Sequence, residues 1–303
     1  MRCRILILAA AGLGWVFGSA VAASDATSRG MVLGPFPTAY LPSKGVLQVS
    51  PYVNYIQLNM AEKLGLDIDP VQSRGVGKYF EKGMRTQFGL APGLGLSYDF
   101  SLTDFSYATK EAEVSSQDVR LKKGFARSPR FGTFAAELGW RRHSTNELKN
   151  SGVALPLSNV LHDYGYGLRG LWSRPLRDYD LHASFGLSDT PEDGDGGQHG
   201  TDLSAGFSRF WAGRWQADAF YQLFDVHRKH PLYSRSSKDR NQTFSFGVMR
   251  HLTDRWALEL RARANDNLFR GIWPFLDREV DRLNFSTYGY FTFALTYRHD
   301  YGR

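Results

Sequence analysis

Charged residues alternate with aliphatic ones near the carboxyl end of the chain. Glu259, Arg261 and Arg263 are separated by Leu260 and Ala262. This spacing places all three charged side chains on one face of a β-strand, because successive side chains of a strand point to opposite faces. Arginine and carboxylate side chains on a water-facing wall select among ions and polar solutes, which is the chemistry of a pore.

Similar alternation places charged residues on the polar faces of other segments. Arg85 and Asp99 flank the three-residue turn Ala91–Gly93, an odd length that lets their two odd-numbered polar rows face each other. We predict that both line a lumen with the three residues above. The predicted lumen set is completed by Glu137, Arg141, Arg169, Asp180, His182 and Asp218.

A different chemistry is suggested by His143 and Ser144, where a predicted strand enters a loop. A serine hydroxyl beside a general base is a nucleophile, so the pair offers a barrel-embedded lipid hydrolase as an alternative. Consecutive strand residues point apart, however, and His143 continues the lumen-facing row of Glu137 and Arg141. We therefore favour a solvated loop start for these two residues.

Two loops carry concentrated charge. Residues 189–197 are acidic and glycine-rich, but they lack the ligand order and final bidentate glutamate of a twelve-residue calcium loop. The segment from His227 to Arg240 is basic, so it is either a lipopolysaccharide contact or a plain solvated loop. His227 and His230 are fewer than the ligands of a usual metal site. The sequence predicts no metal and no cofactor, and it has no nucleotide-binding motif.

Twelve segments with a period of two are predicted to be strands. Tight turns alternate with longer polar connections between them, so antiparallel pairing gathers the tight turns at one end and the longer connections at the other. This asymmetry is typical of an all-β fold, the transmembrane antiparallel up-and-down β-barrel. The predicted strands are 46–58, 83–91, 94–103, 117–126, 132–142, 163–173, 179–188, 202–210, 215–224, 242–250, 256–265 and 285–299. The longer connections are predicted at 59–82, 104–116, 143–162, 189–201, 225–241 and 266–284.

The apolar rows of these strands could face either a dry interior, as in a soluble barrel, or hydrocarbon. Tryptophans near the strand ends favour hydrocarbon, since interfacial aromatic girdles flank membrane barrels. A charge facing lipid costs about 2–4 kcal/mol at the midplane, so the charged rows should face inward. The tryptophans concerned are Trp140 on the loop side and Trp172, Trp211, Trp215 and Trp256 on the turn side.

The amino terminus has its own composition. Residues 1–23 are predicted to be a cleaved signal peptide rather than a retained anchor helix, because the apolar run is short and ends in small residues. Cleavage also removes Cys3, the sole cysteine. Residues 24–45, which contain Gly34–Pro37, are predicted to be a periplasmic segment that enters the lumen as a partial plug, and residues 46–303 are predicted to form the barrel.

Composition excludes one class of protein and gives no support for a second. A mean hydropathy of −0.37 with 22% charged residues leaves no room for a bundle of apolar membrane helices. Without Arg2 and Arg4 the basic count falls from 37 to 35 against 30 acidic residues, a net charge of +5. That excess is too modest to indicate nucleic acid as a partner.

The last segment carries an aromatic row, formed by Phe291, Phe293, Leu295, Tyr297 and Tyr301. With the turn asymmetry, this row makes residues 46–303 resemble the Gram-negative outer-membrane β-barrels, whose closing strand usually ends in an aromatic residue that the insertion machinery recognises. Gly302 and Arg303 after Tyr301 depart from that pattern. The resemblance implies an outer-membrane location, both termini in the periplasm, contact with outer-membrane lipid and lipopolysaccharide, and the insertion machinery as an assembly partner.

Three functions remain open on this basis. The leading hypothesis is a porin-like channel for small polar or charged solutes, with selectivity set by lumen arginines and acidic residues. The second is a hydrolase of lipid or lipid A at the outer rim that uses His143 with Ser144. The third is a non-catalytic envelope or export component that acts through its loops.

Overall fold

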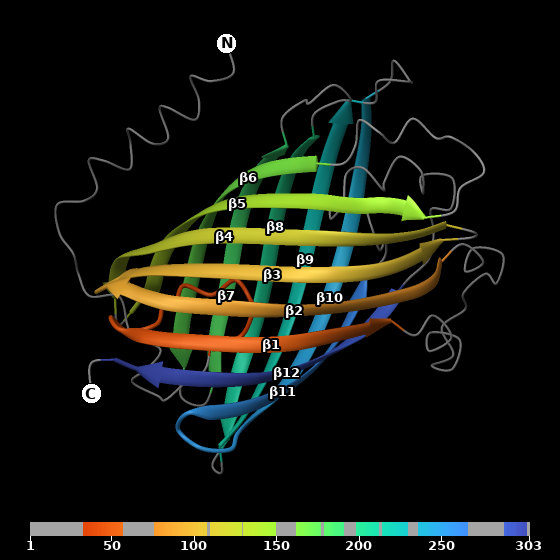
Figure 1. Ribbon diagram of the computed structural model, residues 1–303. Coiled ribbons are helices and arrows are strands. Elements are labelled where there is room, and N and C mark those ends of the chain that lie inside the picture. The colour runs from red at the N-terminus through yellow and green to blue at the C-terminus, as the bar shows by residue number, and fades with distance from the viewer. Residues whose placement is uncertain are drawn as a thin grey trace, which may run out of the picture.

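The computed structural model describes residues 33–56, 76–107, 110–128, 130–149, 162–176, 179–190, 198–211, 214–229, 236–265 and 288–301. These residues form twelve strands in one closed barrel (Figure 1). Every strand pairs antiparallel with the next along the chain, and β12 returns to pair with β1. The predicted up-and-down β-barrel is therefore confirmed. None of the described residues forms a helix long and apolar enough to cross a membrane.

The strands are long, as a tilted barrel wall requires. Their bounds are β1 Val46–Ile56, β2 Val76–Ala91, β3 Leu94–Tyr107, β4 Lys110–Ser128, β5 Gly132–Lys149, β6 His162–Leu176, β7 Tyr179–Thr190, β8 Gln198–Trp211, β9 Trp215–Lys229, β10 Ser236–His251, β11 Trp256–Asn265 and β12 Tyr288–Asp300.

The barrel wall is apolar outside and polar inside. On β8, Leu203 is 56% exposed whereas its neighbours Asp202 and Ser204 are buried, and on β7 Phe185 is 54% exposed beside buried Ser184. A soluble barrel has the opposite arrangement, with its apolar rows in a dry core. The soluble alternative is therefore wrong, because the large aliphatic and aromatic side chains point away from the lumen.

The hairpin register agrees with the predicted parity. Arg85 of β2 lies opposite Asp99 of β3. The turn itself is tighter than predicted, because Ala91 pairs with Leu94 and a bulge between Gly89 and Ala91 supplies the odd residue. Gly93 adopts a φ of 68°, a left-handed conformation that glycine accepts without steric cost.

Several long connections predicted from polarity are parts of strands. The prediction placed a connection at 104–116, yet β3 runs to Tyr107 and β4 begins at Lys110. Similarly, β5 continues to Lys149 and β9 to Lys229. Hairpins that rise above an apolar band keep their backbone hydrogen bonds in water. Apolar alternation therefore marks the membrane-facing band and does not mark the strand ends.

Residues 33–45 lie inside the barrel at the end where the tight turns gather, called here the turn end. Figure 1 shows this red-orange stretch within the ring of strands before β1 begins. We call residues 33–45 the N-terminal segment. Residues 1–32, which include the predicted signal peptide, lie outside the described residues.

Phe185→Arg tests the lipid-facing assignment of the outer wall. We expect it to lower the free energy of unfolding by about 2–4 kcal/mol, because a charge then faces hydrocarbon near the middle of the wall. The measurement is denaturant unfolding of the protein folded in lipid vesicles. Tyr301→Arg, at the turn end, is the matched control and should cost about 1 kcal/mol or less. Equal effects of the two variants would contradict the assignment.

Candidate functional site

A cavity of about 480 Å³ occupies the lumen. It extends from the N-terminal segment at the turn end toward His143, Thr190 and Arg263 near the opposite end. Among the described residues that line it, seven are basic and five are acidic. The basic residues are Arg85, Arg120, Lys122, Arg141, Arg169, Arg261 and Arg263, and the acidic ones are Glu81, Asp99, Asp118, Glu137 and Asp202.

One group of these charges lies on β2 and β3, beside Tyr52 of β1. Arg85 Nε donates to Asp99 Oδ2 at 3.3 Å. The Tyr52 hydroxyl donates to Asp99 Oδ1 at 2.9 Å and contacts Glu81 Oε1 at 3.2 Å, while its ring lies 5.1 Å beneath the Arg85 guanidinium. The two carboxylates are thus held by a phenol and a cation rather than left to repel each other.

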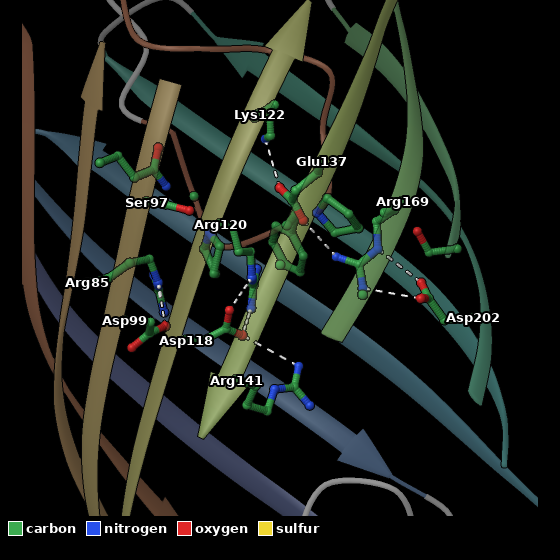
Figure 2. A pocket seen from close by; sticks show the side chains of 18 of the residues that line it. Arg85, Ser97, Asp99, Asp118, Arg120, Lys122, Glu137, Arg141, Arg169 and Asp202 are labelled. Atoms are coloured by element: carbon green, nitrogen blue, oxygen red, sulfur yellow. Dashed lines mark hydrogen bonds and ion pairs between the residues drawn. The ribbon is translucent and has the colours of Figure 1, made fainter. Parts of the chain in front are cut away.

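A second group lies on β4 and β5. Asp118 accepts two hydrogen bonds from Arg120, with Nε to Oδ1 at 2.9 Å and Nη2 to Oδ2 at 2.5 Å. Arg141 of β5 reaches the same carboxylate at 3.5 Å and is 45% exposed. Asp118 therefore holds two guanidinium groups near the cavity surface (Figure 2).

A chain of ion pairs continues around the wall from β4 to β8, as Figure 2 shows. Lys122 Nζ lies 3.6 Å from Glu137 Oε2, and Arg169 Nη1 donates to Glu137 Oε1 at 3.2 Å. Arg169 also reaches Asp202 at 3.2 Å, passing over β7. Gly186 of β7 makes this crossing possible, because a Cβ at that position would overlap the Asp202 carboxylate.

The charges consequently pair along the wall. The partners named above sit on the same strand, on adjacent strands, or one strand apart, and the centre of the lumen keeps the cavity. Buried charges are stable only when paired and hydrogen-bonded. Pairing along the wall meets that condition and leaves space for water and solute.

The predicted residues of β11 divide between wall and cavity. Glu259 and Arg261 form a buried ion pair. The Arg261 guanidinium also lies over the Phe36 ring, 4.4 Å from its centroid. Arg261 and Arg263 line the cavity, whereas Glu259, which precedes them in the same inward-facing row, is buried and does not line it.

Three more predicted lumen residues are buried near the turn end and do not line the cavity. Asp180 accepts a hydrogen bond from the Tyr40 hydroxyl at 2.8 Å. Asp218 accepts from the side-chain amide of Gln216 at 3.0 and 3.1 Å. His182 is 2% exposed and contacts Ser173 and Ser208 through its two ring nitrogens. Asp180 thus holds the N-terminal segment directly.

Polar contacts fix the N-terminal segment to the wall. The backbone N–H of Ala39 donates to Ser173 Oγ at 2.8 Å. Lys122 Nζ donates to the carbonyl oxygens of Thr38 and Tyr40 at 2.9 and 3.5 Å. At the start of the segment, Leu33 N donates to Gln48 Oε1 at 3.1 Å.

Aromatic and apolar contacts complete this attachment. Phe36 stacks on Phe220 at 4.1 Å, Phe220 stacks on His182 at 5.5 Å, and the Tyr40 ring meets His182 edge-on. A second apolar contact packs Ala39 against Ala135 and Leu171. The lumen therefore has an apolar lining where the N-terminal segment packs, and that lining was not predicted.

Sequence reasoning missed several charged residues of the site. Asp118, Arg120 and Lys122 alternate on β4, so their spacing indicated a polar row, but only Val119 and Leu121 stand between them as apolar residues and the strand pattern is weak. Asp202 precedes Leu203 in the same alternating manner. The apolar exception at Phe220, between Asp218 and Gln222, was the available sign that something packs against this wall.

His143 and Ser144 have different surroundings. His143 is 5% exposed, and its Nδ1 lies 2.8 Å from Ser116 Oγ. Ser144 contributes its carbonyl oxygen, which accepts from Ser115 Oγ at 3.3 Å. The hydroxyl beside the His143 ring therefore belongs to Ser116.

The two charged loops are described only at their ends. Asp189 Oδ1 lies 2.8 Å from His199 Nδ1, and Arg240 Nε donates to Asp225 Oδ1 at 2.8 Å. Residues 191–197 and 230–235 lie outside the described residues. Within the described part of the chain, no group of three or more His, Cys, Asp or Glu side chains is arranged to hold a metal ion.

Comparison with known proteins identifies the fold. No protein-family model and no curated protein matches the sequence. The COG4313 outer membrane channel from Pseudomonas putida F1 superposes with a TM-score of 0.53 at 10% identity, covering 89% of this chain and all of that one. The NanC porin gives 0.51 at 8% identity (82% and 98% covered), and LpxR from Salmonella typhimurium gives 0.51 at 10% identity (82% and 99% covered). The chain thus has the fold of outer-membrane β-barrel proteins.

Gly186→Ala tests the ion pair that crosses β7. We expect it to lower the free energy of unfolding by about 1–3 kcal/mol, because the added methyl group displaces Asp202 and leaves Arg169 without that partner. Denaturant unfolding in vesicles measures the effect, and Gly170→Ala, whose Cβ would meet only an ordinary 3.9 Å contact, is the control. In an Asp202→Asn background the cost should shrink. If Gly186→Ala lowers the free energy of unfolding by as much in the Asp202→Asn background as in the wild type, the destabilisation does not come from loss of the Arg169–Asp202 ion pair.

Proposed function

We propose that this protein is an outer-membrane channel for small polar or charged solutes, with both termini on the periplasmic side. The observation that supports it is the charged cavity of about 480 Å³, which extends from the N-terminal segment toward the opposite end of the barrel. Ion selectivity in such channels comes from rings of charged side chains at close quarters. Here the rings are the wall pairs of β2 to β8 and the arginines of β11.

The balance of charge favours anions. Seven basic and five acidic side chains line the described cavity, so the side chains in direct contact with it include a small basic excess. A small basic excess in a narrow aqueous space raises the local concentration of anions and lowers that of cations. Carboxylates between the arginines keep the binding of any one anion weak, which conduction requires.

The N-terminal segment forms the constriction of the proposed channel. It crosses the lumen at the turn end and is attached through Tyr40, Ala39 and Phe36. Solute that enters from the opposite end meets the charged wall first and the N-terminal segment last. The segment thereby sets the conductance, while the wall charges set the selectivity.

The structural neighbours are consistent with this proposal at the level of fold. A channel and a porin share the barrel, and so does LpxR, so the fold does not choose among activities. The proposal of a channel therefore rests on the charged cavity in the lumen and not on the fold.

Replacing Arg141 and Arg263 by alanine tests the selectivity. Both side chains line the cavity near the end opposite the N-terminal segment, and their loss leaves five basic and five acidic residues. We expect the reversal potential in a salt gradient across a planar bilayer to move from the anion side toward zero. Arg130→Ala, at a turn on the outside of the barrel, should leave it unchanged. Absence of any conductance of the wild-type protein in planar bilayers would contradict the proposal.

Loosening the N-terminal segment tests the constriction. The double variant Phe36→Ala with Tyr40→Phe removes the stack on Phe220 and the hydrogen bond to Asp180. We expect a higher single-channel conductance and a noisier open current, measured in planar bilayers. Lys44→Ala alters an exposed residue of the same segment and is the matched control. Unchanged conductance in the double variant would show that the segment does not limit flow.

A further inference from the structure

The outer face of the barrel carries two tryptophans and two arginines in contact at the turn end of β8, β9 and β10. Arg209 lies over the Trp211 ring at 5.1 Å, and Arg250 lies over the Trp215 ring at 5.2 Å. Trp211 and Trp215 face each other across their turn, and Arg250 is directly opposite Trp215. We call these four residues the Arg–Trp patch.

The two arginines of the patch point outward, away from the polar lumen. Arg209 continues the exposed row of Leu203 and Phe207, and Arg250 is likewise exposed. Neither forms an ion pair with an acidic side chain among the residues described, whereas the nearby Arg214 is paired with Asp254 at 3.4 Å. A guanidinium at the boundary of the apolar band is costly unless water or an anion satisfies its donors.

A strip of small outward-facing side chains runs along β9 from the Arg–Trp patch toward the middle of the apolar band. Ala217 lies between Arg209 and Val248, and the next outward residue, Ala219, lies between Phe207 and Phe246. The two alanines are only 6% and 8% exposed, because these larger neighbours rise on either side. We call Ala217 and Ala219 the alanine strip.

The next outward residue of β9 is Tyr221, which closes the alanine strip toward the middle of the wall. One end of the strip is thus charged and interfacial, and the other is apolar and bulky. A ligand with a phosphate at one end and a hydrocarbon chain at the other matches this arrangement.

We propose that the Arg–Trp patch and the alanine strip bind one glycerophospholipid of the turn-side leaflet. Its phosphate lies between Arg209 and Arg250, since guanidinium groups recognise phosphate oxygens through paired hydrogen bonds. The tryptophans hold both guanidiniums at headgroup depth, where indole rings are enriched. One acyl chain packs on Ala217 and Ala219 between Phe207 and Phe246.

The choice of lipid rests on the proposed orientation and is independent of channel activity. Short turns of outer-membrane barrels face the periplasm, and the leaflet on that side consists of glycerophospholipid. Lipid A also carries phosphates, but it belongs to the opposite leaflet. A preference for lipid A would therefore place the patch in the wrong leaflet and overturn the assignment.

Native mass spectrometry of the delipidated, detergent-solubilised barrel tests the site, with phosphatidylglycerol as the probe. We expect the wild type to retain one phosphatidylglycerol, and the variant Arg209→Gln with Arg250→Gln to bind it at least tenfold more weakly. Arg130→Gln removes a different outward arginine, which stacks on Phe131 at 5.4 Å, and should bind as the wild type does. Each variant is first shown to be folded by the heat-dependent shift of its mobility on gels.

Two further variants distinguish a specific lipid site from general attraction of an anionic lipid to positive charge. Ala219→Phe fills the strip while keeping both arginines, and we expect it to weaken phosphatidylglycerol binding as well. Arg209→Lys with Arg250→Lys keeps charge and fold but loses the paired hydrogen bonds, so its binding should lie between those of the wild type and the glutamine variant. Equal binding by wild type and glutamine variant, an equal loss in Arg130→Gln, or tighter retention of lipid A would each overturn the proposal.

Discussion

The structure depends on a constraint that hydrocarbon imposes on backbone. No water is present in the middle of a bilayer to satisfy an N–H or C=O group, so every strand must have two hydrogen-bonded neighbours. The pairing of β1 with β12, from Val46 opposite Asp300 to Ile56 opposite Tyr290, removes the last open edge. Once the sheet closes, each side chain must face either lipid or lumen. The apolar exterior and the polar interior follow from that division.

Closure of the barrel also determines which charged side chains need partners inside the lumen. Charged side chains collected inside a ring of strands are removed from bulk water, and they are stable only with partners. Asp118 and Glu137 each hold two cations, and Arg169 reaches across a glycine to Asp202. Because these pairs run along the wall, the lumen keeps open volume while no lining charge among those pairs is isolated. That arrangement is what makes a selective aqueous route physically reasonable for this barrel.

The turn end of the lumen differs from the rest because apolar side chains of its wall face inward. Ala135, Leu171 and Phe220 face inward there, and residues of the N-terminal segment pack on them. Apolar side chains in a hydrated lumen are costly unless something covers them, so the wall and the segment stabilise each other. The polar clamps at Asp180 and Ser173 then fix the position of the segment, because a buried donor or acceptor without a partner is costly.

The amino-acid sequence alone was enough to predict the fold class, the inward and outward rows, and the register that sets Arg85 opposite Asp99. These features follow from a period of two, which is local and survives in any context. It did not determine how far β4 or β9 extends, because a hairpin in water needs hydrogen bonds and no apolar alternation. Nor did it place Arg169 with Asp202, Tyr40 with Asp180, or Arg209 and Arg250 beside the alanine strip. Those contacts join positions far apart along the chain. They exist only because closure of the sheet fixes which strands lie side by side, and because a glycine or an alanine leaves space between the larger side chains.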